Sequence, residues 1–366
     1  MRFPEFSGEW NKYTINDLAT VVGGGTPDTT VKSYWGGDIQ WFTPSEIGKN
    51  KYVDFSKRTI TRDGLDNSSA KLLPLHTILL SSRATVGECS IASNECTTNQ
   101  GFQSLIAKQC NIDFLYSLIQ TKKKDLIRNA CGSTFLEISA NEIRKIKVAV
   151  PVQNEQEQIA KLLSLIDERI ATQNKIIEDL KKLKSAISER LFKSVKGFTV
   201  LLSDLCDIVK GKQINGENLS DSGNYYVMNG GTEPSGYYDN YNVEASTISI
   251  SEGGNSCGYV QFNTSPFWSG GHCYSIQNIA DKVDNMYLYH YLKSNEDAIM
   301  KLRIGSGLPN IQKKDLAMFK IIVPKIEWQI KISTFLSSLE RKAEIEERIQ
   351  NVMQKQKLYL LQQMFI

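Results

Sequence analysis

The sequence predicts an α+β protein: two mixed α/β domains joined by two long antiparallel coiled-coil helices, the halves forming a pseudo-two-fold repeat. Three observations support this prediction. The chain of 366 residues resembles itself at long range, each half ends in a long segment without glycine or proline, and the remaining parts alternate short apolar runs with glycine-bearing turns. A long-period repeat decides architecture before local propensities do.

The second half of the chain repeats the first at an offset of 173 residues. The matches, which run without a gap, include Gly132-Ser133 with Gly305-Ser306, Ile138 with Ile311, Val150-Pro151 with Val323-Pro324, Gln156 with Gln329, Leu163-Ser164 with Leu336-Ser337, and Phe192 with Phe365. Earlier matches are weaker and fall at offsets of 187 (Asp17-Leu18 with Asp204-Leu205) and 171 (Gly87 with Gly258). The predicted segments are a first domain at 1–151, a first helix at 152–196, a second domain at 197–324 and a second helix at 325–366.

Each domain has the pattern of a mixed α/β module. The apolar runs at 78–80 and 248–250 predict short strands, and 114–127 and 286–302 predict helices. A Val-Pro pair closes the last strand of each module, since the residue before proline avoids the helical conformation.

The two long segments carry heptad patterns. The 37 residues from Gln156 to Phe192 contain no Gly or Pro. At about 1.5 Å per residue they would form a helix of roughly 55 Å. Polar residues interrupt the seams at Gln173 and Lys184 in the first helix and at Gln350 and Lys357 in the second, a pattern that lowers stability but can fix register. The predicted seam residues are Ile159, Leu163, Ile166, Ile170, Ile177, Leu180, Ile187, Leu191, Ile332, Leu336, Leu339, Met353 and Leu360.

Two half-exposed helices in one chain should bury their apolar stripes against each other. Because a whole module separates the helices, an antiparallel pair with the modules at opposite ends is the simplest arrangement. Two alternatives stay open at this point: each helix packs on its own module, or the helices form a homodimer.

Composition bounds the class of protein. The net charge is +3, with segment values of +3 for 1–150, +2 for 151–196, −4 for 197–324 and +2 for 325–366. A chain that gripped DNA alone would be more basic, so partners would supply part of any such grip. The seven cysteines are scattered and never spaced as CxxC, which indicates reduced, packed thiols. The sequence has no long apolar run and its start lacks a signal-peptide pattern, so a cytoplasmic protein without membrane contact is expected.

Motifs of catalysis are missing. The sequence has no GxxxxGK[ST] loop, no GxSxG turn, and neither Asn-Pro-Pro-Tyr nor Asp-Pro-Pro-Tyr, which amino-methylating enzymes use to hold a base. Gly23-Gly24-Gly25 lacks the lysine of a phosphate loop. The three histidines, His76, His272 and His290, are too few and scattered for a metal cluster. We therefore predict no catalytic residues, no metal site and no enzymatic activity in this chain.

Several sequence features, in this order, resemble the specificity subunit of type I restriction–modification systems across nearly the full length. The residues that carry the resemblance are Leu18-Ala19-Thr20-Val21-Val22-Gly23-Gly24-Gly25-Thr26-Pro27, Gly36-Gly37-Asp38-Ile39-Gln40-Trp41-Phe42-Thr43, Thr98-Asn99-Gln100-Gly101-Phe102, and Val150-Pro151 followed by Glu155-Gln156-Glu157-Gln158-Ile159-Ala160. The second half echoes the last of these as Val323-Pro324, Trp328-Gln329 and Ile332. It departs from the pattern because Trp328 stands where the first helix has Glu155.

The resemblance implies a DNA sequence-recognition subunit. Each of two target-recognition domains would read one half of a bipartite, gapped double-stranded DNA target, and the helices would act as a ruler and a docking surface. The implied partners are two methyltransferase subunits and the motor/restriction subunits. S-adenosylmethionine, ATP and Mg are expected on those partners, with no cofactor in this chain.

Residues that could reach bases or phosphates are polar and aromatic side chains in predicted loops, such as Arg or Lys for guanine and Asn or Gln for adenine. The candidates are Lys32, Tyr34, Trp35, Arg58, Arg62, Arg83, Thr85, Asn99 and Gln100 in the first module, and Lys210, Lys212, Asn229, Asn255, Trp268 and His272 in the second. For each a structural role is the alternative: the tryptophans could be core, the arginines solvated surface pairs, and Asn99 a turn cap.

The helix length suggests the form of the target. A helix of roughly 55 Å compares with about 34 Å per turn of B-DNA, so half-sites about one turn apart would fit. The main alternative is a two-module coiled-coil scaffold for protein or glycan ligands, which the near-neutral charge keeps open. An independent nuclease or methyltransferase is a weaker alternative, because the motifs it requires are missing.

Overall fold

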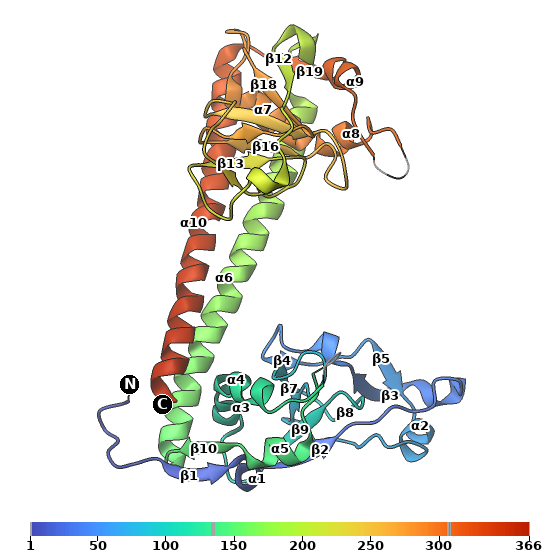
Figure 1. Ribbon diagram of the computed structural model, residues 1–366, viewed down its shortest axis with the longest axis vertical. Coiled ribbons are helices and arrows are strands. Elements are labelled where there is room, and N and C mark those ends of the chain that lie inside the picture. The colour runs from blue at the N-terminus through green and yellow to red at the C-terminus, as the bar shows by residue number, and fades with distance from the viewer. Residues whose placement is uncertain (1, 133–135, 306, 308, 366) are drawn as a thin grey trace. The chain divides into compact units, whose positions relative to one another are not determined.

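The computed structural model describes residues 2–132, 136–305, 307 and 309–365. The chain forms two compact units, the first made of Met1–Thr172 with Gln350–Ile366 and the second of Gln173–Ile349. Each unit holds one α/β module and a part of both long helices, α6 (Gln153–Ser194) and α10 (Ile326–Met364) (Figure 1). The predicted fold class is confirmed, while the four predicted segment boundaries stay a prediction.

The described residues of the first module form three sheets. The five-stranded sheet has the order β2-β9-β6-β7-β4, the three-stranded sheet the order β5-β3-β8, and β1 pairs with β10. The strands are β1 (Asn11–Thr14), β2 (Ala19–Gly23), β3 (Trp35–Phe42), β4 (Tyr52–Val53), β5 (Arg58–Ile60), β6 (Ile78–Leu80), β7 (Cys89–Ala92), β8 (Cys96–Thr98), β9 (Gln103–Ala107) and β10 (Lys147–Val150). The helices are α1 (Ile15–Leu18), α2 (Arg62–Asp66), α3 (Ile112–Thr121), α4 (Lys123–Arg128) and α5 (Ala140–Lys145), with 3-10 turns at Lys32–Tyr34 and Pro44–Glu46.

The second module repeats this topology except that its larger sheet, in the described residues, has four strands and no counterpart of β4. Its sheets have the orders β12-β18-β15-β16 and β14-β13-β17, and β11 pairs with β19. The strands are β11 (Phe198–Leu201), β12 (Asp207–Lys210), β13 (Tyr225–Met228), β14 (Tyr237–Tyr238), β15 (Thr247–Ser251), β16 (Val260–Asn263), β17 (Trp268–Ser269), β18 (Cys273–Gln277) and β19 (Lys320–Val323). The helices are α7 (Asn285–Ser294), α8 (Glu296–Met300) and α9 (Lys313–Ala317), with 3-10 turns at Leu202–Asp204 and Gly216–Asn218. In both modules one strand of the smaller sheet pairs in parallel, β3 with β8 and β13 with β17.

The two predicted strands are present, one as β6 and one within β15. The helices predicted at 114–127 and 286–302 are each divided into two shorter helices. In the first module α3 ends at Thr121 and α4 begins at Lys123. In the second, Asn295 leaves the helical conformation between α7 and α8, and its side-chain amide donates to the Tyr291 carbonyl at 2.8 Å. An asparagine side chain that occupies a helix carbonyl competes with continuation of the helix, a local effect that hydrophobic periodicity does not register.

Each module core includes residues of both long helices. In the first unit Ile159 and Leu163 of α6 and Leu361 and Met364 of α10 are buried in one cluster with the sheet and α3. Phe365 follows α10 and packs against Trp10 and Phe114, with ring centroids 6.1 and 5.1 Å apart.

The second unit shows the equivalent packing. Phe192 of α6 is buried and meets Tyr287 and Tyr291 edge to face at 5.7 and 5.2 Å, while Ile332 and Leu336 of α10 join the same cluster. The repeat offset of 173 maps Phe192 on Phe365. The two phenylalanines therefore anchor the end of each helix into a module that also packs the beginning of the other helix.

Polar seam residues pair across α6 and α10 within each unit. In the second unit Lys184 lies 2.7 Å from Glu340, and in the first Lys357 lies 2.6 Å from Asp167. The offset of 173 maps one of these ion pairs on the other. The helices therefore run antiparallel with a register that the repeat preserves.

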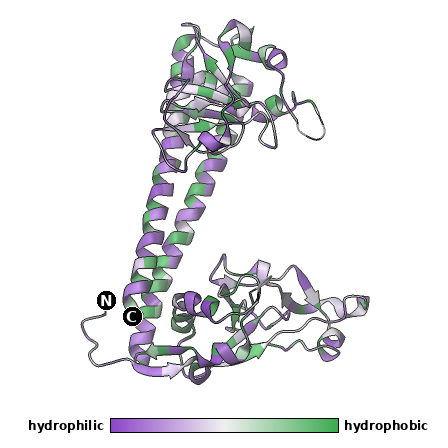
Figure 2. Cartoon of the chain, viewed as in Figure 1, coloured by the Kyte–Doolittle hydropathy of each residue, from purple (hydrophilic) through white to green (hydrophobic). Residues whose placement is uncertain are grey.

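Gln173, the other interruption predicted in the first helix, is buried. Its side-chain N–H group donates to the Glu346 carbonyl at 3.1 Å and to the Glu346 carboxylate. Gln173 and Glu346 are themselves separated by the repeat offset of 173 residues, so they occupy equivalent positions in the two halves. Figure 2 shows apolar and polar residues alternating along both helices, and every predicted seam residue is buried or half-buried.

A buried glutamine ties the start of each long helix to its module. Gln156 accepts from the Asn111 N–H at 3.0 Å and donates to the Pro151 carbonyl at 3.0 Å. Gln329 accepts from the Asp284 N–H at 2.9 Å and donates to the carbonyls of Pro324 and Lys282 at 2.8 and 3.0 Å.

The residue before each glutamine differs between the two helices: Glu155 in α6 and Trp328 in α10. Glu155 is fully buried and accepts two hydrogen bonds from Arg2, both 2.7 Å long, while Trp328 is exposed. Only the first helix start is therefore held by an N-terminal arginine among the described residues.

We expect Gln329→Met to lower the free energy of unfolding by about 1–3 kcal/mol, because the methionine leaves a buried N–H and two carbonyls without partners. Chemical denaturation of the full chain measures this. Gln156→Met should have a similar effect, and exposed Gln354→Met on α10 is the matched control. A Gln329 variant as stable as the Gln354 variant would contradict the anchoring role.

Candidate nucleic-acid interface

The predicted residues of the first module fall into two groups, the first of them around the small sheet. The Arg58 guanidinium lies 3.6 Å from the ring centroid of Trp35, and Trp35 meets Trp41 edge to face at 5.0 Å. Trp35 is half-buried and its indole N–H donates to the Asp28 carbonyl at 3.1 Å. Stacking on an aromatic face orients a guanidinium while its N–H groups stay available. Also in this group are Lys32 and half-buried Tyr34, in the turn before β3, and exposed Arg62, at the start of α2, which pairs with Asp66.

The second group lies on two turns beside the large sheet. Arg83 lies 3.8 Å from Glu137, and Thr85 shares a hydrogen bond of 2.9 Å with Ser81. The Asn99 side chain accepts from the Gly101 N–H at 2.9 Å, so Asn99 caps this turn. The Gln100 side-chain oxygen accepts from the Thr26 hydroxyl. The Ser82 N–H donates to the Gly101 carbonyl at 2.8 Å, so the two turns are adjacent.

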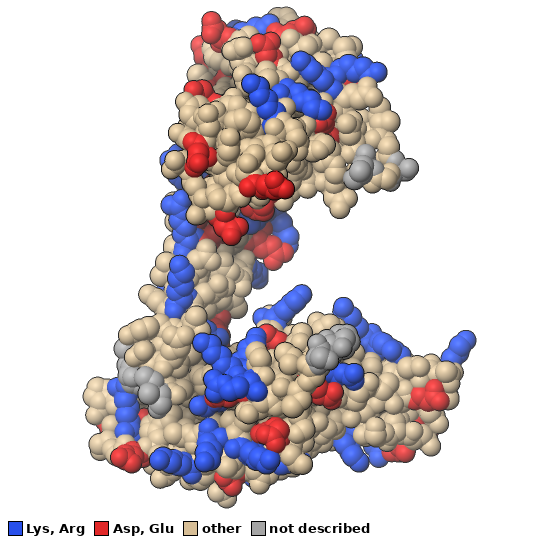
Figure 3. Space-filling model, in the orientation of Figure 1, with Lys and Arg blue, Asp and Glu red and all other residues tan. Residues whose placement is uncertain are grey.

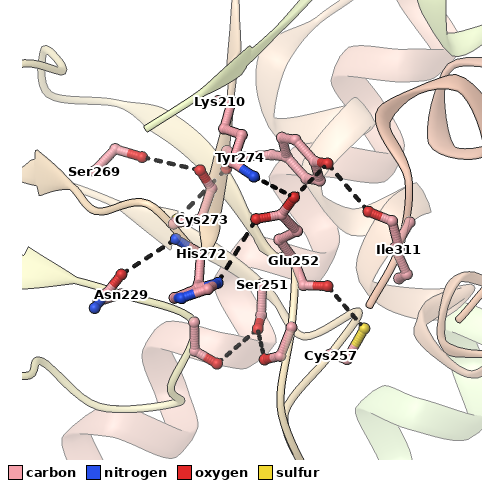
Figure 4. Close-up of polar contacts among 12 residues, drawn as sticks. Lys210, Asn229, Ser251, Glu252, Cys257, Ser269, His272, Cys273, Tyr274 and Ile311 are labelled. Atoms are coloured by element: carbon pink, nitrogen blue, oxygen red, sulfur yellow. Dashed lines mark hydrogen bonds and ion pairs between the residues drawn. The ribbon is translucent and has the colours of Figure 1, made fainter. Parts of the chain in front are cut away.

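Two predicted residues of the second module contact one carboxylate, that of Glu252, and a third contacts the backbone of one of them (Figure 4). Lys210 Nζ lies 2.6 Å from Glu252 Oε1, and His272 Nδ1 lies 3.8 Å from Oε2. The Asn229 side chain accepts from the His272 backbone N–H at 3.2 Å. Lys210 and His272 are more than half exposed, whereas Glu252 is buried.

The other three predicted residues of the second module are Lys212, Trp268 and Asn255. Trp268 is half-buried, and its indole N–H donates to the Lys212 carbonyl at 2.9 Å. In the first module the Trp41 indole donates to the Gly25 carbonyl at 3.0 Å, and an offset of 187 maps Gly25 on Lys212. Asn255 is exposed on the turn after Glu252.

Glu252 was not predicted, although it organises the group. Tyr274 donates to Glu252 Oε1 at 3.0 Å, and burial, followed by this hydrogen bond, raises the pKa of Tyr274. Oε2 of Glu252 is buried without a hydrogen-bond partner among the described residues. None of the repeat offsets seen in the sequence maps Glu252 on its counterpart. The structure identifies this counterpart as Ser82, because the Ile311 N–H donates to the Glu252 carbonyl as the Ile138 N–H does to the Ser82 carbonyl.

These groups can donate hydrogen bonds and positive charge to a ligand. Arginine, lysine and asparagine side chains are the donors that recognise guanine and adenine edges and phosphates. Within the described part of the chain, no group of three or more His, Cys, Asp or Glu side chains could hold a metal ion. Six cysteines are buried and Cys131 is exposed, all as free thiols, and burial raises the pKa of Cys96 to about 12.

The turn between β6 and β7 in the first module and its equivalent in the second share an unusual backbone conformation. Ala84 has φ 63° and Gly254 has φ 79°. The Ala84 N–H donates to the Leu136 carbonyl and the Gly254 N–H to the Pro309 carbonyl, each at 3.0 Å. The left-handed region costs a non-glycine residue roughly 1–2 kcal/mol, so this turn of the first module carries strain that the equivalent turn of the second module avoids.

The two positions allow a reciprocal test. Ala84→Gly should raise the free energy of unfolding by up to about 1 kcal/mol, and Gly254→Ala should lower it by about 1–2 kcal/mol. A Cβ at Gly254 would meet no atom within 4 Å, so any decrease reflects backbone conformation rather than a clash. Denaturation curves of both variants provide the measurement, and equal signs for the two changes would refute the strain.

In the part of the chain that the structure describes, no helix has the length and apolar character needed to cross a membrane.

Comparison with known proteins identifies relatives of both halves. A family model described as the type I restriction modification DNA specificity domain matches residues 7–182 and 197–355. The type I restriction enzyme MjaIX specificity subunit of Methanocaldococcus jannaschii is 37% identical over 192 residues, covering 50% of this chain and 44% of that protein. The EcoprrI specificity subunit of Escherichia coli is 23% identical over 367 residues, covering 91% and 87%. The MjaIX match thus spans less than half of that relative's length.

Two solved structures share the fold. The S subunit of a type I restriction–modification system from M. genitalium has a TM-score of 0.66 at 19% identity, covering 100% of this chain and 99% of that one. A chain from a study of complex assembly and conformational transition of the type I R-M system has a TM-score of 0.64 at 14% identity, covering 99% and 98%.

Proposed function

The chain belongs to the type I restriction–modification DNA specificity family, and from this premise we propose that it reads a bipartite, gapped DNA target as the non-catalytic specificity subunit of such a complex. One observation carries the proposal. The family model matches twice, and each match covers one α/β module together with most of the long helix that follows it. Two readers in one chain imply two half-sites, and unlike readers imply unlike half-sequences.

The exposed polar groups of each module would supply base and phosphate contacts. In the first module these are the Arg58 stack and the Arg83 turn, and in the second the Lys210, Asn229 and His272 group. Arginine pairs with guanine O6 and N7 and asparagine with adenine N6 and N7, each such pair contributing about 1–3 kcal/mol of discrimination.

The long helices would hold the partners. Both present exposed apolar side chains besides their seams, among them Leu165 and Leu183 on α6 and Phe335 and Leu358 on α10. We propose that two methyltransferase subunits dock there and that the motor/restriction subunits join them. S-adenosylmethionine, ATP and Mg would then be bound by those partners, and the chemistry would be theirs.

Co-expression with the methyltransferase of its own system, followed by mapping of modified adenines, tests this function. The expected result is a stable complex that methylates one gapped sequence, while either protein alone methylates nothing. Methylation of an ungapped sequence, or DNA methylation by this chain alone, would overturn the proposal.

A further inference from the structure

Charge is distributed very unevenly in the second module. Of the nine Lys and Arg in 197–324, five lie in 301–320, together with only one of the thirteen Asp and Glu. Residues 301–320 therefore carry a net charge of +4 and the rest of the module −8. A polyanion that approaches this module is attracted to one segment and repelled by most of the remainder.

The five cations form one surface, which we name the 301–320 patch: Lys301, Arg303, Lys313, Lys314 and Lys320. All five are exposed, and none forms an ion pair with any described residue. Figure 3 shows Lys and Arg gathered where Figure 1 places α9. Lys301, Arg303 and Lys320 line a shallow hollow of about 630 Å³, together with Asp315 and apolar side chains such as Met318.

The equivalent segment of the first module lacks such a surface. Residues 128–147 hold four cations, but Arg128 pairs with Asp125 and Lys145 with Glu142. Of the remaining cations of the second module, Lys210 and Lys293 are also paired, with Glu252 and Glu296. Within the described part of the second module, five of the seven cations without an ion pair therefore lie in the 301–320 patch, and the other two are Lys212 and Lys282.

The patch is connected directly to the Glu252 group. Ile304 and Asn310 form a bridge, and Asn310 also bridges Gly253. The Ile311 N–H donates to the Glu252 carbonyl at 2.8 Å. The backbone that leaves the patch therefore supports Glu252, which Lys210 and His272 contact, and the turn that carries Asn255.

We propose that the 301–320 patch binds the sugar–phosphate backbone of duplex DNA beside the second half-site. This inference rests on the proposed function and assigns the DNA contact to a defined surface of the second module. Backbone contacts fix the position of a reader on DNA without carrying sequence information. An otherwise acidic module needs such contacts more than the first module, whose net charge is positive.

Two double variants and one matched control test the proposal. The variants Lys301→Gln/Arg303→Gln and Lys313→Gln/Lys314→Gln each remove two patch charges. The control Lys196→Gln/Lys282→Gln removes two exposed charges of the same unit outside the patch. Each full chain, assembled with its methyltransferase, is titrated with duplex DNA bearing the mapped target at several salt concentrations, and thermal unfolding verifies the fold.

The steepness of log affinity against log salt should fall by about 0.9 for each DNA phosphate that a variant no longer neutralises. We expect a fall of about one to two in each patch variant and none in the control, with discrimination between target and non-target DNA unchanged. Unchanged salt dependence of DNA binding in both patch variants would overturn the proposal. It would also be overturned if the patch variants kept the salt dependence of the unmodified chain but no longer bound the methyltransferase, because the patch would then be a protein contact. Failure of the unmodified complex to prefer its target would instead refute the proposed function.

Discussion

Insertion of seven residues between Thr172 and Gln173 together with seven between Ile349 and Gln350 is expected to lengthen the gap in the DNA target and keep both half-sequences. These are the points at which the chain passes from one compact unit to the other, so every contact within each unit is retained. Seven residues keep the heptad phase to within about 20° and add roughly 10.5 Å of helix, which corresponds to at most about three base pairs.

Mapping of modified adenines after co-expression with the methyltransferase measures this change. Methylation of the original site should fall to background while a site with a longer gap becomes modified. Insertion into α6 alone is the control, because the added heptad then has no partner on α10, and modification of both sites should disappear. An unchanged gap after the double insertion would show that the helices do not set the spacing.

Phe192→Ala should destabilise the second unit by about 3–5 kcal/mol, a large share of the 5–15 kcal/mol of an ordinary domain. Phe192 is buried against Tyr287 and Tyr291, and truncation leaves a cavity where α6, α10 and the module meet. Phe335→Ala on α10 is the control, since that ring is half exposed and its removal should cost much less.

Urea denaturation of the full chain, followed by tyrosine and tryptophan fluorescence, reports both variants. In the assembled complex, Phe192→Ala should also make DNA methylation less dependent on the second half-sequence, and should affect its dependence on the first half-sequence less. The reason is that the first module keeps its own anchor at Phe365. Equal stability of the two alanine variants would mean that the aromatic cluster does not hold the second module to the helix.

Repeats and periodicity made the architecture predictable from sequence. The seam residues follow heptads, and Gln156 and Gln329, Phe192 and Phe365, and the Val-Pro pairs stand at one fixed offset because the same contact is made twice. These signals are local or strictly periodic, so a single sequence contains them.

The candidate interface was only partly predictable. Composition identified Lys210, Asn229 and His272 as possible ligand contacts, but not that Lys210 and His272 contact Glu252. Lys210 and Glu252 stand 42 positions apart and meet only because their strands are brought together in the fold. The break of the predicted helices depends on local competition at Asn295, which periodicity does not register. The 301–320 patch was hidden by a module whose net charge is negative.

The paired glutamine anchors have an evolutionary consequence. Gln156 and Gln329 attach unlike modules to the helices through the same hydrogen bonds to a proline carbonyl and a backbone N–H. Genetic exchange of a module with a homologue therefore transfers it to a joint that already fits. We expect such recombination to create new DNA specificities in one step, while the surfaces that the long helices present stay unaltered.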